Sequence, residues 1–377
     1  MSTGEIYLDG AASTPLDPRV IETMDDAARR GAGNVASIHW AGVAAARCVE
    51  RARAIVAGRL GATPDEIVFC GSGTEGNNHA VLGTAWAEGR GHLVISAVEH
   101  ASVLEPARWL ETQGFSLTLL PVDSGGRVRP ADLAQALRPE TILVSVHHGN
   151  NESGAVQPIA DLGRICRSHP VRFHVDACQS FGKLPVRPDE MGADLVTVDG
   201  HKLHGPHGVG ALYVREGIAL APLLRGGGQE RGLRSGTHNT EGIAGFGRAV
   251  ELADEADAER LAGLRQHLLE RLRAAIPTLC EVAGSGPVLP SVLTVRFPGH
   301  SGKAIAMELS RRGIAVGTGS ACQAGEDRPS RVLLAMGLTP GQCMEAVRFG
   351  LHRFLDEAML DRTVEVLTEV PGNRGQA

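Results

Sequence analysis

Aromatic residues make up only 3% of this 377-residue chain, and long apolar runs are absent. No segment approaches the roughly 18 consecutive apolar residues of a membrane-spanning helix. Residues 1–5 also lack the basic and apolar regions of a secretory signal. We therefore expect a soluble, cytoplasmic protein that does not bind membranes, with a core packed mostly by small aliphatic side chains.

The chain lacks paired cysteines. Its seven cysteines are scattered, with no C-x-x-C pair and no Cys/His cluster at zinc-finger spacing, so neither a disulfide framework nor a metal site is expected. Most of the thiols, such as Cys70 after Ile67-Val68-Phe69, have apolar neighbours and are interpreted as small buried hydrophobes. Cys322 is the exception, because glycine and polar residues surround it.

A basic field is missing as well. The formal charge is -6, the pI is near 6.2, and no block of Lys and Arg is interleaved with aromatic residues. Because nucleic-acid binding depends on positive charge facing the phosphate backbone, direct nucleic-acid binding is not expected.

Short apolar runs alternate with helical patterns in the first two thirds of the chain. The runs span residues 66–70, 92–96, 141–146, 171–175, 194–198 and 210–214. Strands separated by helices of this length predict an α/β fold with a mostly parallel sheet covered on both faces. In such sheets ligands bind at the carboxyl ends of the strands, which is where the polar motifs of this sequence fall.

The length exceeds the usual size of one domain, which favours a large domain and a smaller one. We assign residues 15–252 to the large domain, and residues 1–14 and 253–377 to a smaller α+β domain. The patterns behind this division are a Gly-rich loop at 218–240, a long helix at 241–276, a strand near 291–297, helices near 302–312 and 340–369, and a frayed end at 371–377.

Lys202 lies in a Gly- and His-rich turn between two predicted strands. A neutral amine beside a cofactor can form a Schiff base with an aldehyde. A lone lysine is more often a solvated surface charge, so the turn around Lys202 is what favours the chemical interpretation.

Asp176 ends the predicted strand that begins at Val171. A carboxylate at the tip of a buried strand is costly unless it meets a cation, and a pyridinium nitrogen is such a cation. The alternative is an N-cap for the helix that follows.

Residues 69–78 link a predicted strand to a predicted helix through several glycines. Glycines let backbone N–H groups approach a phosphate, the helix N-terminus adds its positive dipole end, and Thr74 offers a hydroxyl. The segment matches neither the Walker A pattern nor the dinucleotide fingerprint, and by itself an ordinary glycine turn explains it equally well.

These three motifs, in this order on successive strand ends, resemble the fold-type I enzymes that use pyridoxal 5′-phosphate, and within them the class V aminotransferases. The flanking segments resemble the cysteine desulfurases of that class. They are residues 6–12, 33–39, 98–100, 149–152, 227–237 and 317–322. The resemblance extends from residue 6 to about residue 355.

The resemblance implies a role for each matching residue. Lys202 would carry pyridoxal 5′-phosphate, Asp176 would pair with the ring nitrogen, and His100 would stack on the ring and move protons. Asn151 and Gln179 would bond the ring hydroxyl. The residues implied at the phosphate are Gly73, Thr74, His201 and, from a second subunit, Thr237.

Arg348 resembles the residue that clamps the substrate carboxylate, aided by Asn151, a task suited to a planar guanidinium. Cys322 lies in a stretch too polar and glycine-rich to be core, so an accessible thiol is expected. The resemblance implies that L-cysteine becomes L-alanine while its sulfur passes to Cys322 as a persulfide.

The seven-residue step from Cys322 to Pro329 resembles the group I desulfurases. Their loop delivers sulfur to an acceptor protein in iron-sulfur assembly, tRNA thiolation or DNA phosphorothioation. The segment 226–237 resembles a loop that completes the site of a neighbouring subunit, which implies a homodimer.

Asp199 departs from the family pattern, because a serine or threonine usually bonds the cofactor phosphate there. A carboxylate next to a phosphate is repelled, so we expect Asp199 to point away from it.

The sequence leaves two other functions open. One is another class V activity that needs no cysteine nucleophile, such as a selenocysteine lyase, an aminotransferase or a C–S lyase. The other is a binding partner or scaffold that kept the fold and lost the chemistry, and the presence of Lys202, Asp176 and Cys322 argues against it.

Overall fold

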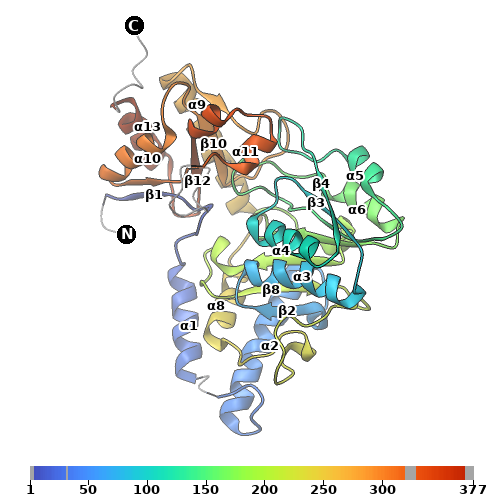
Figure 1. Cartoon of the computed structure of the whole chain (residues 1–377). Coiled ribbons are helices and arrows are strands. Elements are labelled where there is room, and N and C mark those ends of the chain that lie inside the picture. The colour runs from blue at the N-terminus through green and yellow to red at the C-terminus, as the bar shows by residue number, and fades with distance from the viewer. Residues whose placement is uncertain (1–3, 31–32, 319–327, 370–377) are drawn as a thin grey trace.

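The computed structural model of the chain describes residues 4–30, 33–318 and 328–369 (Figure 1). Within these residues the largest sheet has seven strands in the spatial order β2-β8-β7-β6-β5-β3-β4. The strands are β2 (Ile67–Cys70), β3 (His92–Ser96), β4 (Ser116–Leu120), β5 (Thr141–Ser145), β6 (Arg172–Asp176), β7 (Leu195–Asp199) and β8 (Gly210–Val214). Only β8 runs antiparallel to its neighbours, so the predicted, mostly parallel sheet is confirmed.

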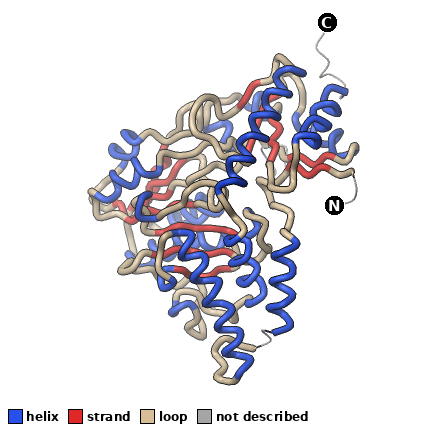
Figure 2. Tube along the Cα trace, turned by 180° about the vertical axis from the view of Figure 1, so that it is seen from behind, coloured by secondary structure: helices blue, strands red, loops and turns tan. Residues whose placement is uncertain are grey.

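Helices cover both faces of this sheet, as Figures 1 and 2 show. Successive strand residues point to opposite faces: Val94 packs in a cluster with α2, α6 and α8, whereas Leu93 and Ile95 pack against α3 and α4. The helices of this part are α1 (Pro18–Arg30), α2 (Trp40–Leu60), α3 (Gly73–Glu88), α4 (Ala101–Thr112), α5 (Pro130–Ala136), α6 (Ile159–Arg167), α7 (Pro188–Met191) and α8 (Thr240–Glu251). Short 3-10 turns are η1 (Pro64–Glu66), η2 (Gly200–Lys202) and η3 (Glu230–Gly232).

The C-terminal third builds a second hydrophobic core around two small sheets. The sheets consist of β1 (Ile6–Leu8) with β11 (Ile314–Val316), and of β9 (Cys280–Glu281), β10 (Val292–Arg296) and β12 (Ala346–Gly350). The helices are α9 (Glu255–Ala275), α10 (Gly302–Arg311), α11 (Arg331–Ala335), α12 (Pro340–Met344) and α13 (Glu357–Glu369). Ile6 and Leu8 of β1 also pack in this core.

Two predictions for the C-terminal third were wrong. The helix expected over 241–276 is two helices, because the Asp254 carboxylate accepts a hydrogen bond from the Asp257 N–H at 2.7 Å and starts α9 as a new helix. The helix expected over 340–369 is interrupted by β12, which is fully buried and pairs with β10. Pairing and burial there outweigh local helix propensity.

Other parts of the prediction need smaller changes. The loop expected over 218–240 is present but contains η3, and β4 was not predicted. The expected frayed end at 371–377 lies outside the described residues. In the described part of the chain, no helix is both long enough and apolar enough to cross a membrane.

Candidate active site

The carboxyl ends of β3, β5, β6 and β7 and the start of α3 surround one cavity of about 280 Å³. Of the residues expected at a cofactor and substrate site, those lining it are Gly73, Thr74, His100, Asn151, Asp176, Gln179, His201, Lys202 and Arg348. Thr237 is exposed and does not line this cavity. Cys322 lies outside the described residues.

A larger cavity of about 720 Å³ lies between α1, α2 and α8. Its charged side chains belong mostly to those helices, and none of the expected site residues lines it. We therefore assign the chemistry to the smaller cavity, where the polar strand ends converge.

Asp176 is the last residue of β6 and is only 7% exposed. Its carboxylate accepts hydrogen bonds from the Cys178 N–H at 3.0 Å and from the Asn77 side-chain amide at 2.7 Å. Burial by itself would raise the pKa of Asp176, but the Cys178 N–H and nearby His100 outweigh it and the pKa is lowered. The carboxylate is therefore ionised, as a partner of a pyridinium nitrogen must be.

Lys202 ends the 3-10 turn η2 that follows β7. Its Nζ donates to the backbone carbonyls of Ala11 and Ala12 at 2.9 and 2.7 Å, in the segment after β1. The amine is thus held at the wall of the cavity by the N-terminal segment, close to Asp176 and Asp199, which line the same cavity.

His100 is the N-cap of α4, and its Nδ1 accepts a hydrogen bond from the Ser102 N–H at 3.1 Å. Because Nδ1 accepts, the proton of the neutral ring resides on Nε2. Burial lowers the pKa of His100, and the positive charge of Lys202 lowers it further. The negative charge of Asp176 has the opposite effect but does not outweigh them. A neutral ring that carries one mobile proton suits a residue that transfers protons.

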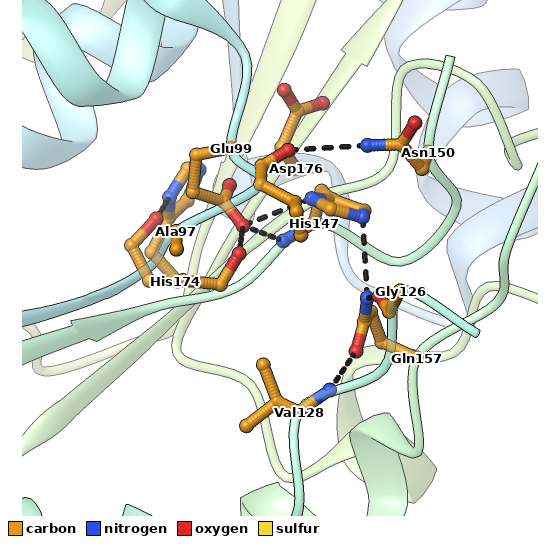
Figure 3. Close-up of polar contacts among 12 residues, drawn as sticks. Ala97, Glu99, Gly126, Val128, His147, Asn150, Gln157, His174 and Asp176 are labelled. Atoms are coloured by element: carbon orange, nitrogen blue, oxygen red, sulfur yellow. Dashed lines mark hydrogen bonds and ion pairs between the residues drawn. The ribbon is translucent and has the colours of Figure 1, made fainter. Parts of the chain in front are cut away.

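A buried polar chain supports the turn that carries His100 (Figure 3). Glu99 is fully buried, and its Oε1 accepts from Ser96 Oγ at 2.6 Å and from the backbone and ring N–H groups of His147 at 2.8 and 2.9 Å. His147 in turn lies 3.4 Å from the Gln157 amide nitrogen. Arg331 donates to the carbonyls of Ala97 and Glu99, so α11 is joined to the same turn.

Arg348 lies on β12 and is 2% exposed. One terminal nitrogen donates to Asp9 Oδ1 at 2.8 Å, and the other donates to the carbonyl of Asn151 at 2.9 Å. Its buried Nε has no hydrogen-bond partner among the described residues. A guanidinium fixed in this way at the cavity retains donors for a carboxylate.

Gln179 also has unused hydrogen-bonding capacity. Its side-chain nitrogen donates to the Ala11 carbonyl at 2.7 Å, while its buried Oε1 has no partner among the described residues. A buried orphan acceptor indicates a missing donor, and a ring hydroxyl would supply one. The ionised Asp176, the amine of Lys202 and this acceptor fit the ring of pyridoxal 5′-phosphate.

The Asp199 carboxylate faces the start of the glycine loop, and its expected orientation away from a phosphate stays a prediction. Its Oδ2 accepts the N–H of Gly73, the first residue of α3, at 2.5 Å, and its Oδ1 accepts the N–H of His201 at 3.1 Å. The ideal Cβ position on Gly73 lies 2.9 Å from Asp199 Oδ2 and 2.6 Å from Cys178 Sγ, so only glycine fits there. The carboxylate thus occupies N–H groups that were expected to face a phosphate.

Two residues of the site escaped the sequence prediction. Asn77 holds Asp176, and Asp9 holds Arg348. Asn77 was within reach, because it lies in the glycine motif three residues after Thr74 and so on the same face of α3. Asp9 carried no such signal, since its partner lies 339 positions away.

The chain matches known proteins along nearly its whole length. The aminotransferase class-V family matches residues 6–362. A cysteine desulfurase IscS of Dictyoglomus turgidum is 41% identical over 372 residues, which are 97% of this chain and 94% of that protein.

Solved structures agree with this. A NifS-like protein superposes with a TM-score of 0.91 at 35% identity, covering 97% of this chain and 99% of that one. A structure described as SspA in complex with cysteine gives 0.83 at 37% identity, covering 92% and 98%.

Proposed function

Because this chain belongs to the aminotransferase class-V family and aligns with cysteine desulfurases over nearly its full length, we propose that it passes the sulfur of L-cysteine to Cys322 and then to an acceptor protein. The chain is a cysteine desulfurase, and the cofactor of this family is pyridoxal 5′-phosphate. The observation that carries the residue assignment is the convergence of Lys202, the ionised Asp176 and Arg348 on one cavity.

The proposed residue roles follow from these contacts. The cofactor, when bound, supplies an electron sink for charge that develops at the α-carbon of the amino acid. Arg348 binds the carboxylate of L-cysteine with donors that Asp9 and Asn151 leave available. His100 exchanges a proton through Nε2, since Nδ1 is engaged by Ser102. The solved complex of SspA with cysteine supports this substrate.

The sulfur step balances without an outside oxidant or reductant. The Cys322 thiolate attacks the sulfur of L-cysteine, forming an S–S bond while the C–S bond breaks. The electron pair of that bond stays with the carbon skeleton, which takes up a proton and leaves as L-alanine. The products are L-alanine and a persulfide on Cys322.

Replacement of the nucleophile tests this proposal. With Cys322→Ser, L-alanine formation from L-cysteine should fall by at least about a hundredfold, and label from [35S]cysteine should no longer remain on the protein. Cys280→Ser, at a half-buried cysteine on β9, is the control and should retain both. If Cys322→Ser released sulfide and alanine as fast as the parent enzyme, a C–S lyase would be the better assignment.

The acceptor and the assembly are further parts of the proposal. Iron-sulfur assembly, tRNA thiolation and DNA phosphorothioation stay candidate destinations, to be ranked by which purified acceptor protein takes label from the persulfide. We propose a homodimer, supported by the exposure of Thr237 outside its own chain's cavity. A cytoplasmic location is proposed because the six cysteines among the described residues are free thiols, as in reducing compartments.

A further inference from the structure

Asp199 places a buried negative charge inside the loop system expected to hold the cofactor phosphate. The residue is 4% exposed and ends β7 immediately before η2. Its two oxygens accept the N–H groups of Gly73 and His201, one from each segment of the expected phosphate cradle. A dianionic phosphate that enters this cradle needs the same N–H donors that Asp199 already occupies.

The surroundings compensate only part of this charge. On η2, the Lys202 amine and the His201 ring, whose Nε2 lies 3.6 Å from Asp199 Oδ1, face the carboxylate. At the end of β6, Asp176 adds a second negative charge. The thiols of Cys178, which follows β6, and of Cys70, on β2, lie in the field of Asp199. Burial raises the pKa of Asp199 against the opposing effect of the two backbone N–H groups and Lys202.

We propose that Asp199 makes cofactor binding proton-linked: the phosphate group binds in this cradle together with a proton on the Asp199 carboxylate. A protonated acid carries no charge and can donate a hydrogen bond to an anion, whereas a carboxylate can only accept and repels it. The inference rests on the proposed cofactor site and goes beyond it, because it gives Asp199 control over how affinity varies with pH.

The sign of the effect follows from linkage. A nearby phosphate raises the pKa of Asp199 further than burial does, so binding takes up a proton at any pH between the value of the free protein and that of the complex. The phosphate contribution to affinity is complete below that window. Within the window it falls by up to about tenfold for each pH unit of increase.

Calorimetry on the full-length chain freed of cofactor measures this proton directly. The ligand is pyridoxine 5′-phosphate, which has an alcohol in place of the aldehyde and so forms no bond to Lys202. Titrations at mildly alkaline pH in two buffers of different ionisation enthalpy give the number of protons taken up. The parent protein should take up about one proton more than Asp199→Asn, and Asp199→Asn should bind at least about tenfold more tightly.

Two controls and a second Asp199 variant complete the experiment. Pyridoxine without phosphate should bind the parent protein and Asp199→Asn equally. Asp161→Asn removes an exposed carboxylate on α6 and should behave like the parent protein. Asp199→Ser, which restores a hydroxyl donor, should also bind more tightly and serves if the Asn variant does not fold.

Equal proton uptake in the parent protein and both Asp199 variants would overturn the inference. Weaker binding by both variants would also overturn it, since the carboxylate would then act as an anchor that orients Gly73. In either case the proposed function would stand. If pyridoxine 5′-phosphate failed to bind the parent protein at all, the cofactor site itself would be wrong.

Discussion

At the residue scale, contacts within the protein hold the side chains of the proposed site in place and leave them hydrogen-bonding capacity for ligands. The two carboxylate oxygens of Asp176 accept hydrogen bonds from Asn77 and Cys178, and the group is ionised. The two terminal nitrogens of Arg348 donate to Asp9 and to the Asn151 carbonyl, and the guanidinium has further N–H donors for a ligand. Side chains fixed in this way lose little conformational freedom when a ligand binds.

Arg348→Lys tests the carboxylate clamp. A lysine amine has three donors on one nitrogen, without the planar fork of a guanidinium. It therefore cannot keep the contacts to Asp9 and Asn151 and also bind a carboxylate bidentately. We expect the KM for L-cysteine to rise about tenfold to a hundredfold, with a smaller change in kcat. Steady-state kinetics measure the split between KM and kcat.

Two comparisons separate this effect from general damage. Arg271→Lys changes an exposed arginine of α9 and should leave KM unchanged. Competitive inhibition by cysteamine, which lacks the carboxylate, should be the same in the parent enzyme and Arg348→Lys. An unaltered KM in Arg348→Lys would show that the carboxylate binds elsewhere.

Candidates for the chemical residues could be identified from the sequence, whereas most of the residues that hold them in place could not. The motifs around Lys202 and Asp176 indicated a chemical role, and the resemblance to the family implied one for Arg348. The structure brings all three residues to one cavity. The sequence did not indicate that the backbone N–H groups of Gly73 and His201 hold the Asp199 carboxylate. Such contacts depend on the packing of β7 beside the start of α3.

At the element scale, burial explains which strands were predictable. The runs that form β2, β3, β7 and β8 are buried at every position and read as continuous apolar segments. β4 lies at the sheet edge with mostly half-buried or exposed residues, so its pattern was too weak. β12 has only five residues, and its partners on β10 lie 50 or more positions earlier in the chain.

An ion pair fixes the loop that precedes Thr237. Glu230 on η3 bonds Arg53 of α2 through two contacts of 2.7 Å, and it also accepts the Phe69 N–H of β2 at 2.8 Å. Glu230 and Arg231 have φ of 48° and 55°, in the left-handed region that non-glycine residues disfavour. The buried pair therefore holds a strained turn in place.

Glu230→Gln should destabilise the protein by about 3 kcal/mol at neutral pH, because it removes the buried partner of the Arg53 charge and leaves only the more exposed Glu50. Burial by itself would raise the pKa of Glu230, but Arg53 and His238 lower it to about 2 from 4.5. A depressed carboxyl pKa contributes stability above the unfolded value, and this stability is lost as the pH falls toward the folded value. The difference between the two proteins should shrink between about pH 5 and about pH 2.

Urea unfolding at a series of pH values, at one protein concentration, measures this difference. Glu111→Gln on the exposed face of α4 is the matched control and should show no pH-dependent loss. A constant difference between the parent protein and Glu230→Gln across the acid range would contradict the assigned ion pair.

At the scale of the whole molecule, the two hydrophobic cores meet at the cavity. The strands and turns around Asp176 and Lys202 belong to the larger core region, whereas Arg348 comes from β12 of the smaller one. The segment after β1 crosses between them, and its carbonyls at Ala11 and Ala12 bind Lys202. The proposed domains, 15–252 against 1–14 with 253–377, thus contribute complementary parts of the proposed site: the expected cofactor residues from one and the expected substrate clamp, Arg348, from the other.

Hybrid dimers test whether Thr237 serves the neighbouring subunit. If Thr237 acts across the interface, neither a Lys202→Ala dimer nor a Thr237→Ala dimer has an intact site. Loss of the Thr237 hydroxyl should weaken cofactor binding about tenfold or more. In a hybrid of the two chains, one site combines both defects while the other has Lys202 from one chain and an intact Thr237 from its partner. Mixing should therefore restore one tight cofactor site per dimer.

The readout is cofactor retained per dimer after dialysis, together with alanine formation, on hybrids isolated by two different affinity tags. Thr278→Ala, at an exposed threonine after α9, replaces Thr237→Ala in the control hybrid. If Thr237 acted within its own chain, the only site with Lys202 would carry the Thr237 defect, and mixing would restore no tight site. Because the two arrangements predict opposite results from the same pair of chains, the experiment decides whether the exposed end of the 226–237 loop belongs to a shared active site.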